Sequence, residues 1–583
     1  MAKIKMTINN RVVEAEEGQT ILDVARENGI HIPTLCYLKG YTGTGACRVC
    51  QVEVEGARTL CAACVYPVRE GLVVKTNSQR AIEARRQVVE LIVSNHNKDC
   101  LACIRNGSCE LQKLCSDLGI RPGAYAGVHT TPTLDEAAPG LVRDTSKCVL
   151  CGRCVAACEK HQGLGILGYL NRGFKTKVGP VYDKSFADVN CMQCGQCVNV
   201  CPVGALHEHE EIDDVISAIN DLEKFVIVQT APAVRASLGE EFGMPIGTRV
   251  TGKMAASLKM MGFDRVYDTN FGADLTIMEE AYEFLHRFKE GGVLPMTTSC
   301  SPGWVNYVER EYPEILPHLS TAKSPHMMMG AMCKTYFAER NNLDPKNVYV
   351  VSVMPCTAKK YEKKREENLT RGLQDVDSVI TTRELGRMIK MFGIDFANLK
   401  DEAFDQDLLG EYTGAGAIFG VSGGVMEAAL RTAAYELNGK NDIEMIDFES
   451  VRGEEGLKVA DIEVNGVKIK VAVAHSMEIA KPLLDEIKAG ISPYQFIEIM
   501  GCPGGCVNGG GQSYVPALVR NSGFDWKTAR AKALYEEDKI MPLRRSHQNT
   551  QILALYKDYL GEPNSHLAHE LLHTHYTEKP RFK

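Results

Sequence analysis

Two stretches, CVLCGRCVAAC (148–158) and CMQCGQCVNVC (191–201), repeat the cysteine spacing C-x2-C-x2-C-x3-C. We interpret them as one fold unit used twice. This density of cysteine is typical of paired 4Fe–4S clusters, in which the last cysteine of each run binds the cluster of the other run. Zinc sites usually take two separate cysteine pairs instead. The spacing predicts two ligand sets: Cys148, Cys151, Cys154 and Cys201, and Cys191, Cys194, Cys197 and Cys158.

The composition narrows the class of protein further. The chain has 583 residues, a net charge of −8 and 22 cysteines, of which 17 lie between Cys36 and Cys201. A disulfide scaffold would be short and secreted, whereas the start, MAKIKMTINN, lacks the apolar core of a signal peptide. We therefore expect metal ligation in a reducing cytoplasm. Without a long apolar stretch or a basic block, we expect neither membrane insertion nor a nucleic-acid partner.

Four cysteines near the N-terminus have the pattern C-x10-C-x2-C-x13-C: Cys36, Cys47, Cys50 and Cys64. The first gap is wider than in plant-type 2Fe–2S ligation. The pattern resembles the 2Fe–2S module of hydrogenases and of the large iron–sulfur subunit of respiratory complex I. Cys61 is a rival for the last position. We prefer Cys64, because Cys-x6-Gly leading into GLVVKT resembles the end of that module.

A further set has the pattern H-x3-C-x2-C-x5-C: His96, Cys100, Cys103 and Cys109. We predict a 4Fe–4S cluster held by one histidine and three cysteines. A neutral imidazole in place of a thiolate makes a cluster less negative and should raise its potential. Cys115 lies outside this spacing, and we expect it to be structural.

The apolar pattern predicts a modular chain of α+β and α/β units. The expected domains are residues 1–78, which are β-rich, 79–125, which are helical, 140–210, which hold the repeat, and 220–583. The first should contain a hairpin (3–10 with 12–17) and a short helix (20–29), and residues 121–140 read as a linker.

Alternating strands and helices in the last unit predict sheets with helical cover. The expected strands are 224–230, 348–354, 416–421, 470–475 and 496–500, and the expected helices include 277–288 and 381–392. Ligands gather where strands end in such folds. Cys356 and Cys502 each follow an expected strand, and Cys300 follows the run GVLPMTTS (292–299), where we also expect a strand to end.

Three segments of this unit, TSCSPGW (298–304), MPCTAKKYE (354–362) and EIMGCPGGCVNGG (498–510), resemble the signature segments of FeFe hydrogenases. Those signatures are TSCCPxW, MPCxxKxxE and ExMxCxxGCxxGG, and the second and third match completely. The order of the modules also resembles the long clostridial type. The chain looks most similar to the catalytic subunit of NAD(P)-linked, in some cases electron-bifurcating, hydrogenases.

The resemblance implies an N-terminal β-grasp 2Fe–2S domain and a large domain that holds an H-cluster. This cofactor is a 4Fe–4S cube joined to a diiron site that bears CO, cyanide and an azadithiolate. It implies that Cys356 and Cys502 hold the cube and that Cys506 bridges it to the diiron site. The pocket should be lined by Met354, Pro355, Met500, Lys359 and Ala233, the last in place of a serine common in the family.

The first segment departs from the family pattern. The family has two adjacent cysteines, of which the first relays protons and the second ligates the cube. The ungapped alignment, which we favour slightly, makes Cys300 the relay and Ser301 a weak oxygen ligand. In the alternative, Cys300 ligates the cube and another group relays protons, since thiolate is the better soft ligand.

The same alignment implies a proton relay through Cys300, Glu280, Ser320 and Glu283, with Arg287 near the exit. Glu280, Glu283 and Arg287 lie at i, i+3 and i+7, so one helix face holds all three. Taken from the residues alone, this pattern is more typical of a solvated charged face with a Glu–Arg pair.

Three other patterns carry less weight. His569 and His573 form an HExxH motif near the C-terminus, which we interpret as a chance match on a docking helix. Cys333 lies in a Met-rich helical stretch and is expected in the core. The Gly-rich segment 414–424 has no nucleotide-binding fingerprint, so any NAD(P) should bind to a partner subunit.

These patterns predict an enzyme that reversibly oxidises H2. It should carry an H-cluster, three accessory 4Fe–4S clusters and one 2Fe–2S cluster. Electrons should pass to ferredoxin or to flavin- and NAD(P)-binding iron–sulfur subunits in a hetero-oligomer. A complex I-like electron-transfer subunit, an iron–sulfur assembly factor and an H2 sensor are the alternatives.

Overall fold

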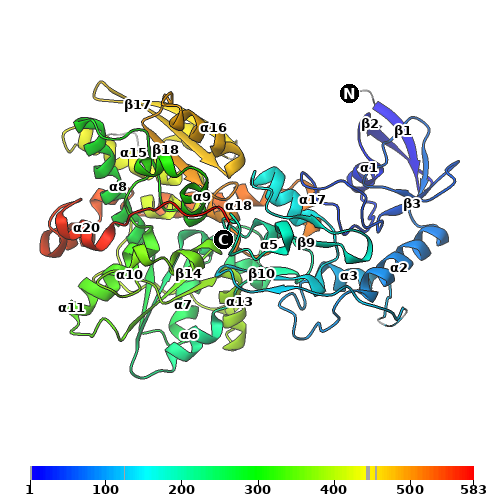
Figure 1. Cartoon of the computed structure of the whole chain (residues 1–583), viewed down its shortest axis with the longest axis horizontal. Coiled ribbons are helices and arrows are strands. Elements are labelled where there is room, and N and C mark those ends of the chain that lie inside the picture. Colours follow the sequence, from blue (N-terminus) through cyan, green and yellow to red (C-terminus); the bar gives the residue numbers. More distant parts are fainter. Residues whose placement is uncertain (1–2, 122, 124, 442–446, 454–455, 583) are drawn as a thin grey trace.

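The computed structural model describes residues 3–121, 123, 125–441, 447–453 and 456–582. Residues 1–2 of the predicted first domain and residues 122 and 124 of the predicted linker lie outside the described part. The N-terminal modules occupy one end of the molecule and the large domain the other, with the cysteine repeat between them (Figure 1). Among the described residues, no helix combines the length and apolarity needed to cross a bilayer.

The N-terminal module is a five-stranded sheet in the order β2-β1-β5-β3-β4. The strands are β1 (Lys3–Ile8), β2 (Arg11–Glu16), β3 (Gln51–Val54), β4 (Cys61–Ala62) and β5 (Val73–Lys75). Helix α1 (Ile21–Glu27) begins at a Thr20–Asp23 capping box and buries its apolar face against the sheet. The predicted hairpin and short helix are confirmed.

The next two modules are built mainly around their cysteine loops. Helices α2 (Gln79–Ser94) and α3 (Glu110–Asp117) flank the loop that carries Cys100 and Cys103. The repeat unit has a small sheet in the order β10-β7-β6 and a β8–β9 hairpin. Its elements are β6 (Leu134–Asp135), β7 (Leu141–Asp144), α4 (Arg153–Ala156), β8 (Gly168–Leu170), β9 (Lys177–Gly179), α5 (Gln196–Val200) and β10 (Leu206–Glu208). The predicted linker is therefore too long, because β6 already pairs with β7.

The large domain contains two four-stranded sheets. The first, in the order β12-β11-β14-β15, is wholly parallel. The second, β13-β18-β17-β16, is parallel except for its β16–β17 hairpin. The strands are β11 (Phe225–Thr230), β12 (Arg265–Asp268), β13 (Met296–Thr297), β14 (Val348–Met354), β15 (Ser378–Thr381), β16 (Leu457–Val464), β17 (Val467–His475) and β18 (Phe496–Met500).

Helices cover and join these sheets (Figure 1). The longest is α8 (Asn270–Glu290), which is buried along most of its length. The others of four or more residues are α6 (Ile212–Ile219), α7 (Thr251–Met260), α9 (Pro302–Glu311), α10 (Pro325–Met332), α12 (Ala358–Glu362), α13 (Thr382–Met391), α14 (Gly414–Ala417), α15 (Gly424–Leu437), α16 (Met477–Lys488), α17 (Ala517–Ser522), α18 (Trp526–Ile540), α19 (Thr550–Leu555) and α20 (His566–Leu572).

One expected strand is wrong. Residues 416–421 form the end of α14 and a 3-10 turn (Ile418–Gly420) instead of a strand. A short apolar run does not distinguish a buried strand from a buried helix. Here glycine decides, because a Cβ at Gly416 would lie 2.6 Å from the carbonyl oxygen of Asn270. The helix therefore packs directly on the start of α8.

A buried ion pair joins α9 to the chain that follows α12. Both guanidinium nitrogens of Arg365 donate to the Glu309 carboxylate at 2.7 Å, and both side chains are buried. We expect Arg365→Met to destabilise the large domain by about 3–5 kcal/mol, because Glu309 loses its main counter-charge. Trp304, fully buried on α9, reports unfolding by fluorescence in a Trp526→Phe background.

Arg371→Met is the matched control. Arg371 also pairs with two carboxylates, Glu339 and Glu570, but its side chain is 46% exposed. Its loss should cost less than about 1 kcal/mol. Equal shifts of the urea midpoint for the two variants would contradict the prediction.

Candidate active site

One buried cavity in the large domain collects cysteines from distant parts of the chain. Cys356 follows β14, Cys502 follows β18, and Cys506 begins a 3-10 turn (Cys506–Asn508). Cys300 and its neighbour Ser301 follow β13 and line the same cavity. The expectation that the carboxyl ends of strands bring these residues together is met.

Glycine lets these segments approach backbone to backbone. A Cβ at Gly509 would lie 2.1 Å from the carbonyl oxygen of Pro355, and one at Gly505 would lie 2.6 Å from the Ser422 amide nitrogen. Gly505 also has φ +93°, a conformation that other residues rarely adopt. The glycines of the third segment therefore fix Cys506 close to Cys356.

The cysteines of the cavity lie in an apolar environment. Burial raises the pKa of Cys506 to about 12 and also raises the pKa values of Cys356 and Cys502. Such thiols become thiolates when a cation binds them. The walls between them are largely apolar, with Phe419, Met354 and Met500 among the lining residues, together with Pro355 and Ala233.

Lys359 is the cation that faces this cavity. Its Nζ donates to the Cys300 carbonyl oxygen at 3.0 Å and to Glu362 at 2.7 Å. Burial opposes ionisation of Glu362, but Lys359 and His326 together lower its pKa to about 2. The ammonium is therefore anchored, with its charge balanced by a neighbouring carboxylate.

His326 is a cavity residue that the sequence analysis missed. Its Nε2 bonds to the same Glu362 oxygen at 2.7 Å, and burial lowers its pKa to about 4, so the imidazole is neutral. No sequence pattern links SPHMMMG (324–330) to the site. The contact arises only when α10 packs beside α12.

Cys300 and Ser301, in the first signature segment (298–304), have different contacts. The Ser301 hydroxyl accepts the Gly501 backbone N–H at 3.2 Å. Burial raises the pKa of Cys300 well above its usual value, with the charge of Glu280 adding to the effect. Both residues line the cavity, so the choice between them as a ligand stays a prediction.

The expected relay residues lie behind Cys300 on α8 and the segment after α9. Glu280 is fully buried and Glu283 nearly so, so a solvated charged face is wrong for both. Burial, with the nearby charge of Glu283, raises the pKa of Glu280 to about 8. Glu280 is thus protonated at neutral pH and can donate a proton. Ser320 Oγ donates to Glu283 at 2.8 Å, and Arg287 donates to Glu283 at 2.6 Å.

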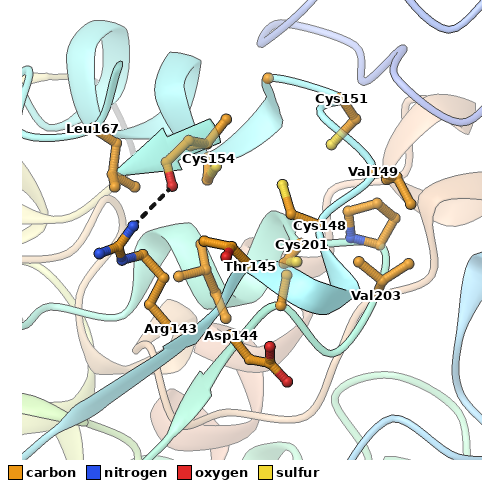
Figure 2. A pocket seen from close by; sticks show the side chains of 15 residues that line it. Arg143, Asp144, Thr145, Cys148, Val149, Cys151, Cys154, Leu167, Cys201 and Val203 are labelled. Carbon is orange, nitrogen blue, oxygen red and sulfur yellow. Dashed lines mark hydrogen bonds between the residues drawn. The ribbon is translucent and has the colours of Figure 1, made fainter. Parts of the chain in front are cut away.

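The first predicted cluster site of the repeat is a cavity lined by the expected four cysteines: Cys148, Cys151, Cys154 and Cys201. Figure 2 shows their sulfurs around one space, with Cys201 contributed by the other run. Arg143 also lines this cavity. In the second set, burial raises the pKa values of Cys191 and Cys197, and the nearby thiols of Cys194 and Cys158 add to the effect.

The N-terminal set also converges. The Cys36 backbone N–H donates to Cys47 Sγ at 3.4 Å, and Cys64 lies against Cys50 and close to the other two thiols. Cys61 instead donates to the Thr59 carbonyl oxygen at 3.6 Å. The location of Cys64 beside the other three thiols therefore favours Cys64 over Cys61 as the fourth cysteine of the N-terminal set.

The His/Cys set lines a cavity of its own with one unexpected member. His96, Cys100, Cys103 and Cys109 surround it, and so does Cys115. The sequence spacing had set Cys115 aside. The signal was on α3, where Cys115 follows the buried Leu111 by four residues and so shares its face.

The cysteine sites adjoin one another on both sides of the repeat. Cys194 lies close enough to Cys356 and Cys502 for their charges to interact. At the other side of the repeat, a Cβ on Gly204 would lie 2.6 Å from Cys103 Sγ. Among the described residues, no three His, Cys, Asp or Glu side chains are arranged to hold a single metal ion.

The HExxH motif and Cys333 make contacts within the large domain. His573 bonds to Glu279 and to Thr321 at 2.9 and 2.7 Å, and the His569 ring lies against it in a tilted pair. Cys333 is fully buried in the core of the large domain, as expected.

Family models match successive parts of the chain. They describe a 2Fe-2S iron-sulfur cluster binding domain (1–79), an NADH-ubiquinone oxidoreductase-G iron-sulfur binding region (85–122) and a 4Fe-4S dicluster domain (147–205). Residues 224–510 match the C-terminal domain of the iron only hydrogenase large subunit, and 525–579 match the iron hydrogenase small subunit.

Whole relatives agree with these matches. The chain is 48% identical to the NADP-reducing hydrogenase subunit HndD of Solidesulfovibrio fructosivorans over all of both chains. It is 44% identical to iron hydrogenase 1 of Clostridium pasteurianum over 98% of this chain and 99% of that one. A solved structure of a HydA1 variant from Chlamydomonas reinhardtii covers 63% of this chain and 99% of its own, with 39% identity and a TM-score of 0.57. The chain belongs to the FeFe hydrogenase family.

Proposed function

We propose that this hydrogenase interconverts H2 with two protons and two electrons at an H-cluster held by Cys356, Cys502 and Cys506. The observation that carries the proposal is the meeting of these three buried thiols on one cavity. Thiolates are soft ligands suited to iron clusters, and the glycine turns around Cys502 and Cys506 leave room for a bulky group. When bound, the H-cluster supplies the chemistry that splits or forms H2.

Lys359 is proposed to orient the anionic part of the cofactor. Its ammonium is fixed by Glu362 and the Cys300 carbonyl oxygen, so it can add a charge-assisted hydrogen bond to a cyanide ligand. The apolar lining excludes water from this contact. A charge in such a dry site acts more strongly than one in solvent.

Protons are proposed to move between the cavity and Glu283 through Cys300, Glu280 and Ser320. Glu280 is well suited to the central position, because its raised pKa of about 8 keeps it able both to gain and to lose a proton near neutral pH. The Ser320 hydroxyl already contacts Glu283. Each transfer passes one proton between oxygen or sulfur atoms and leaves the electron count unchanged.

Ser301 is proposed to be the fourth protein ligand of the cube, with Cys300 kept for the relay. Ser301 lines the cavity. Burial and the nearby Glu280 raise the pKa of Cys300, which suits a thiol that passes protons to Glu280. An oxygen ligand is harder than a thiolate and should alter the potential of the cube.

Electrons are proposed to travel along the series of cysteine sites. The order is the H-cluster, the 4Fe–4S site containing Cys194, the 4Fe–4S site containing Cys201, and then the His96 and N-terminal sites. This gives three accessory 4Fe–4S clusters and one 2Fe–2S cluster. The electrostatic effect of Cys356 on Cys194 and the close approach of Gly204 to Cys103 support the order.

The electron partner is proposed to be ferredoxin or a flavin- and NAD(P)-binding iron–sulfur subunit in a hetero-oligomer. The name of one relative, NADP-reducing hydrogenase subunit, supports the second choice. A reducing cytoplasm suits a chain whose four accessory cluster sites alone need 16 intact ligands, 15 of them thiols.

The bridging role of Cys506 can be tested directly. After maturation with the diiron precursor, the wild-type protein should evolve H2 from reduced viologen and show carbonyl and cyanide infrared bands. Cys506→Ser should lose both, because hard oxygen replaces the bridging sulfur, while iron analysis still finds the accessory clusters. Cys61→Ser is the control. Matured wild-type protein without these infrared bands would contradict the proposed H-cluster site.

The role of Glu280 predicts a turnover defect without loss of the cofactor. Glu280→Gln should lower H2 evolution by about 10²-fold or more, since an amide cannot relay the proton, and the infrared bands should remain. Glu290→Gln, on the exposed end of the same helix, should behave as wild type. A Glu280→Gln enzyme with full turnover would contradict the relay.

Substitutions at Cys300 and Ser301 distinguish the two possible fourth ligands of the cube. Cys300→Ala should keep the iron and the paramagnetic resonance spectrum of the cube but lose turnover. Ser301→Ala should leave the cube incompletely ligated and lower its iron content, and Ser301→Cys should shift its midpoint potential in a redox titration. Loss of the cube in Cys300→Ala alone would show that the thiol is the ligand.

A further inference from the structure

The proposed proton relay needs an acceptor beyond Glu283. On its inner side, Glu283 accepts the Ser320 hydroxyl. On its outer side it accepts Arg287 at 2.6 Å. A guanidinium stays protonated in proteins and cannot take up another proton. Arg287 can hold Glu283 in place, but it cannot be the next proton carrier.

Thr321 connects Glu283 to a group that can carry a proton. Its hydroxyl lies 3.3 Å from one Glu283 carboxylate oxygen and 2.7 Å from Nδ1 of His573. The backbone fixes this arrangement. The amide of Lys323 donates to the carbonyl oxygen of Leu572, and that of Thr574 to the carbonyl oxygen of Thr321, both at 2.8 Å. The segment after α20 therefore lies antiparallel to residues 321–323, and His573 faces Thr321.

The surroundings of His573 suit a residue that gains and loses a proton. Its Nε2 lies 2.9 Å from the fully buried Glu279. With Nε2–H donating to this carboxylate, Nδ1 of the neutral ring holds the lone pair that accepts the Thr321 hydroxyl. Glu279 also stabilises the charged ring. Tyr556 and the Asn564 backbone N–H donate to Glu279 and hold it in position.

The route from His573 reaches the surface through its neighbour. The His569 ring lies against that of His573 in a tilted pair, with centroids 4.0 Å apart, and His569 is exposed. His569 lies in α20 and His573 directly follows it, four residues later, which accounts for the contact. Figure 1 shows α20 at the outer edge of the large domain.

We propose that Thr321, His573 and His569 form a proton exit that branches from Glu283. The inference rests on the proposed function, because it needs protons to arrive at Glu283. In the step, the Glu283 carboxyl proton passes to Thr321 Oγ while the Thr321 hydroxyl proton passes to His573 Nδ1. One proton moves, no electron moves, and His573 becomes an imidazolium beside Glu279. The His573 imidazolium then gives its extra proton to water beside the exposed His569 ring and becomes neutral again, and H2 formation uses the reverse order.

The structure also defines the competing route. Glu283 keeps about 9% of its surface exposed, so direct exchange with water is the alternative. The two routes differ in one atom, the Thr321 hydroxyl oxygen. Direct exchange does not need it, whereas the histidine route cannot work without it.

The test compares Thr321→Val with Thr321→Ser in the matured, full-length enzyme. Valine keeps the shape of threonine but removes the hydroxyl, and serine restores it. We expect Thr321→Val to lower H2 evolution by about tenfold or more and Thr321→Ser to recover it. Thr574→Val is the control, because Thr574 lies next to His573 but its hydroxyl donates to the Glu367 carbonyl oxygen. Unchanged carbonyl and cyanide bands in all variants confirm an intact cofactor.

Two further readouts separate a relay from a structural role. Free imidazole should restore turnover to His573→Ala, because it can replace the missing base, and should not restore it to Thr321→Val. Infrared difference spectra of the H2-treated enzyme should show a protonated carboxyl signal that is larger in Thr321→Val than in wild type and is removed by Glu283→Gln.

The outcomes are distinct from those of the proposed function. Wild-type protein that evolves no H2 after maturation would overturn the proposed function. Active wild type with equally active Thr321→Val, and no imidazole effect on His573→Ala, would overturn the histidine route and assign release to Glu283 itself.

Discussion

The arrangement of this molecule depends on the close approach of two glycine backbones. A Cβ on Gly195 would lie 2.8 Å from Cα of Gly510, and one on Gly510 would lie 2.2 Å from the Cys194 carbonyl oxygen. No larger side chain fits at either position. The contact joins the second cysteine run directly to the third signature segment, and it sets Cys194 beside Cys356 and Cys502. The proposed electron transfer between the repeat and this cavity would therefore depend on a packing constraint.

Hydrogen bonds reinforce the same junction. The side chains of Gln196 and Asn199 on α5 donate to the carbonyl oxygens of Asn508 and Gly509 at 2.8 and 3.0 Å. Thr357 Oγ donates to the Gln193 carbonyl oxygen at 2.6 Å. These donors satisfy carbonyl groups of irregular backbone that would otherwise be buried without a partner. The irregular cysteine loops can thus be buried deep in the molecule, away from water.

The sequence predicted the parts of the site that local patterns encode. Cysteine spacing predicted the four cysteines that line one cavity of the repeat, including Cys201 from the other run. It did not show that Cys115, which was set aside as structural, also lines the His/Cys cavity, because a helix face rather than a loop presents that thiol. It also missed His326, whose bond to Glu362 spans 36 residues and exists only through tertiary packing.

The sequence spacing also could not show that the charged residues of α8 are buried. Glu280, Glu283 and Arg287 on one helix face are typical of a solvated surface, and only the family resemblance favoured a relay. In the structure, α8 lies between the two sheets of the large domain and buries the carboxylates along with its apolar residues. The same i, i+3, i+7 spacing thus produces an acid with a pKa of about 8 at Glu280 and an ion pair at Glu283. The raised pKa of Glu280 and the buried ion pair of Glu283 therefore depend on the residues that pack over α8.

The serine at position 301 shows how a departure from a signature is accommodated locally. Ser301 precedes Pro302, the first residue of α9, and its hydroxyl accepts the Gly501 N–H from the segment that carries Cys502. A thiol is a weaker and larger acceptor than a hydroxyl. Serine therefore ties the first and third signature segments together through a hydrogen bond at the point where the family uses a thiolate. This bond keeps the geometry of the cavity. If Ser301 is the fourth ligand, as proposed above, an oxygen atom would also set the electronic properties of the cube.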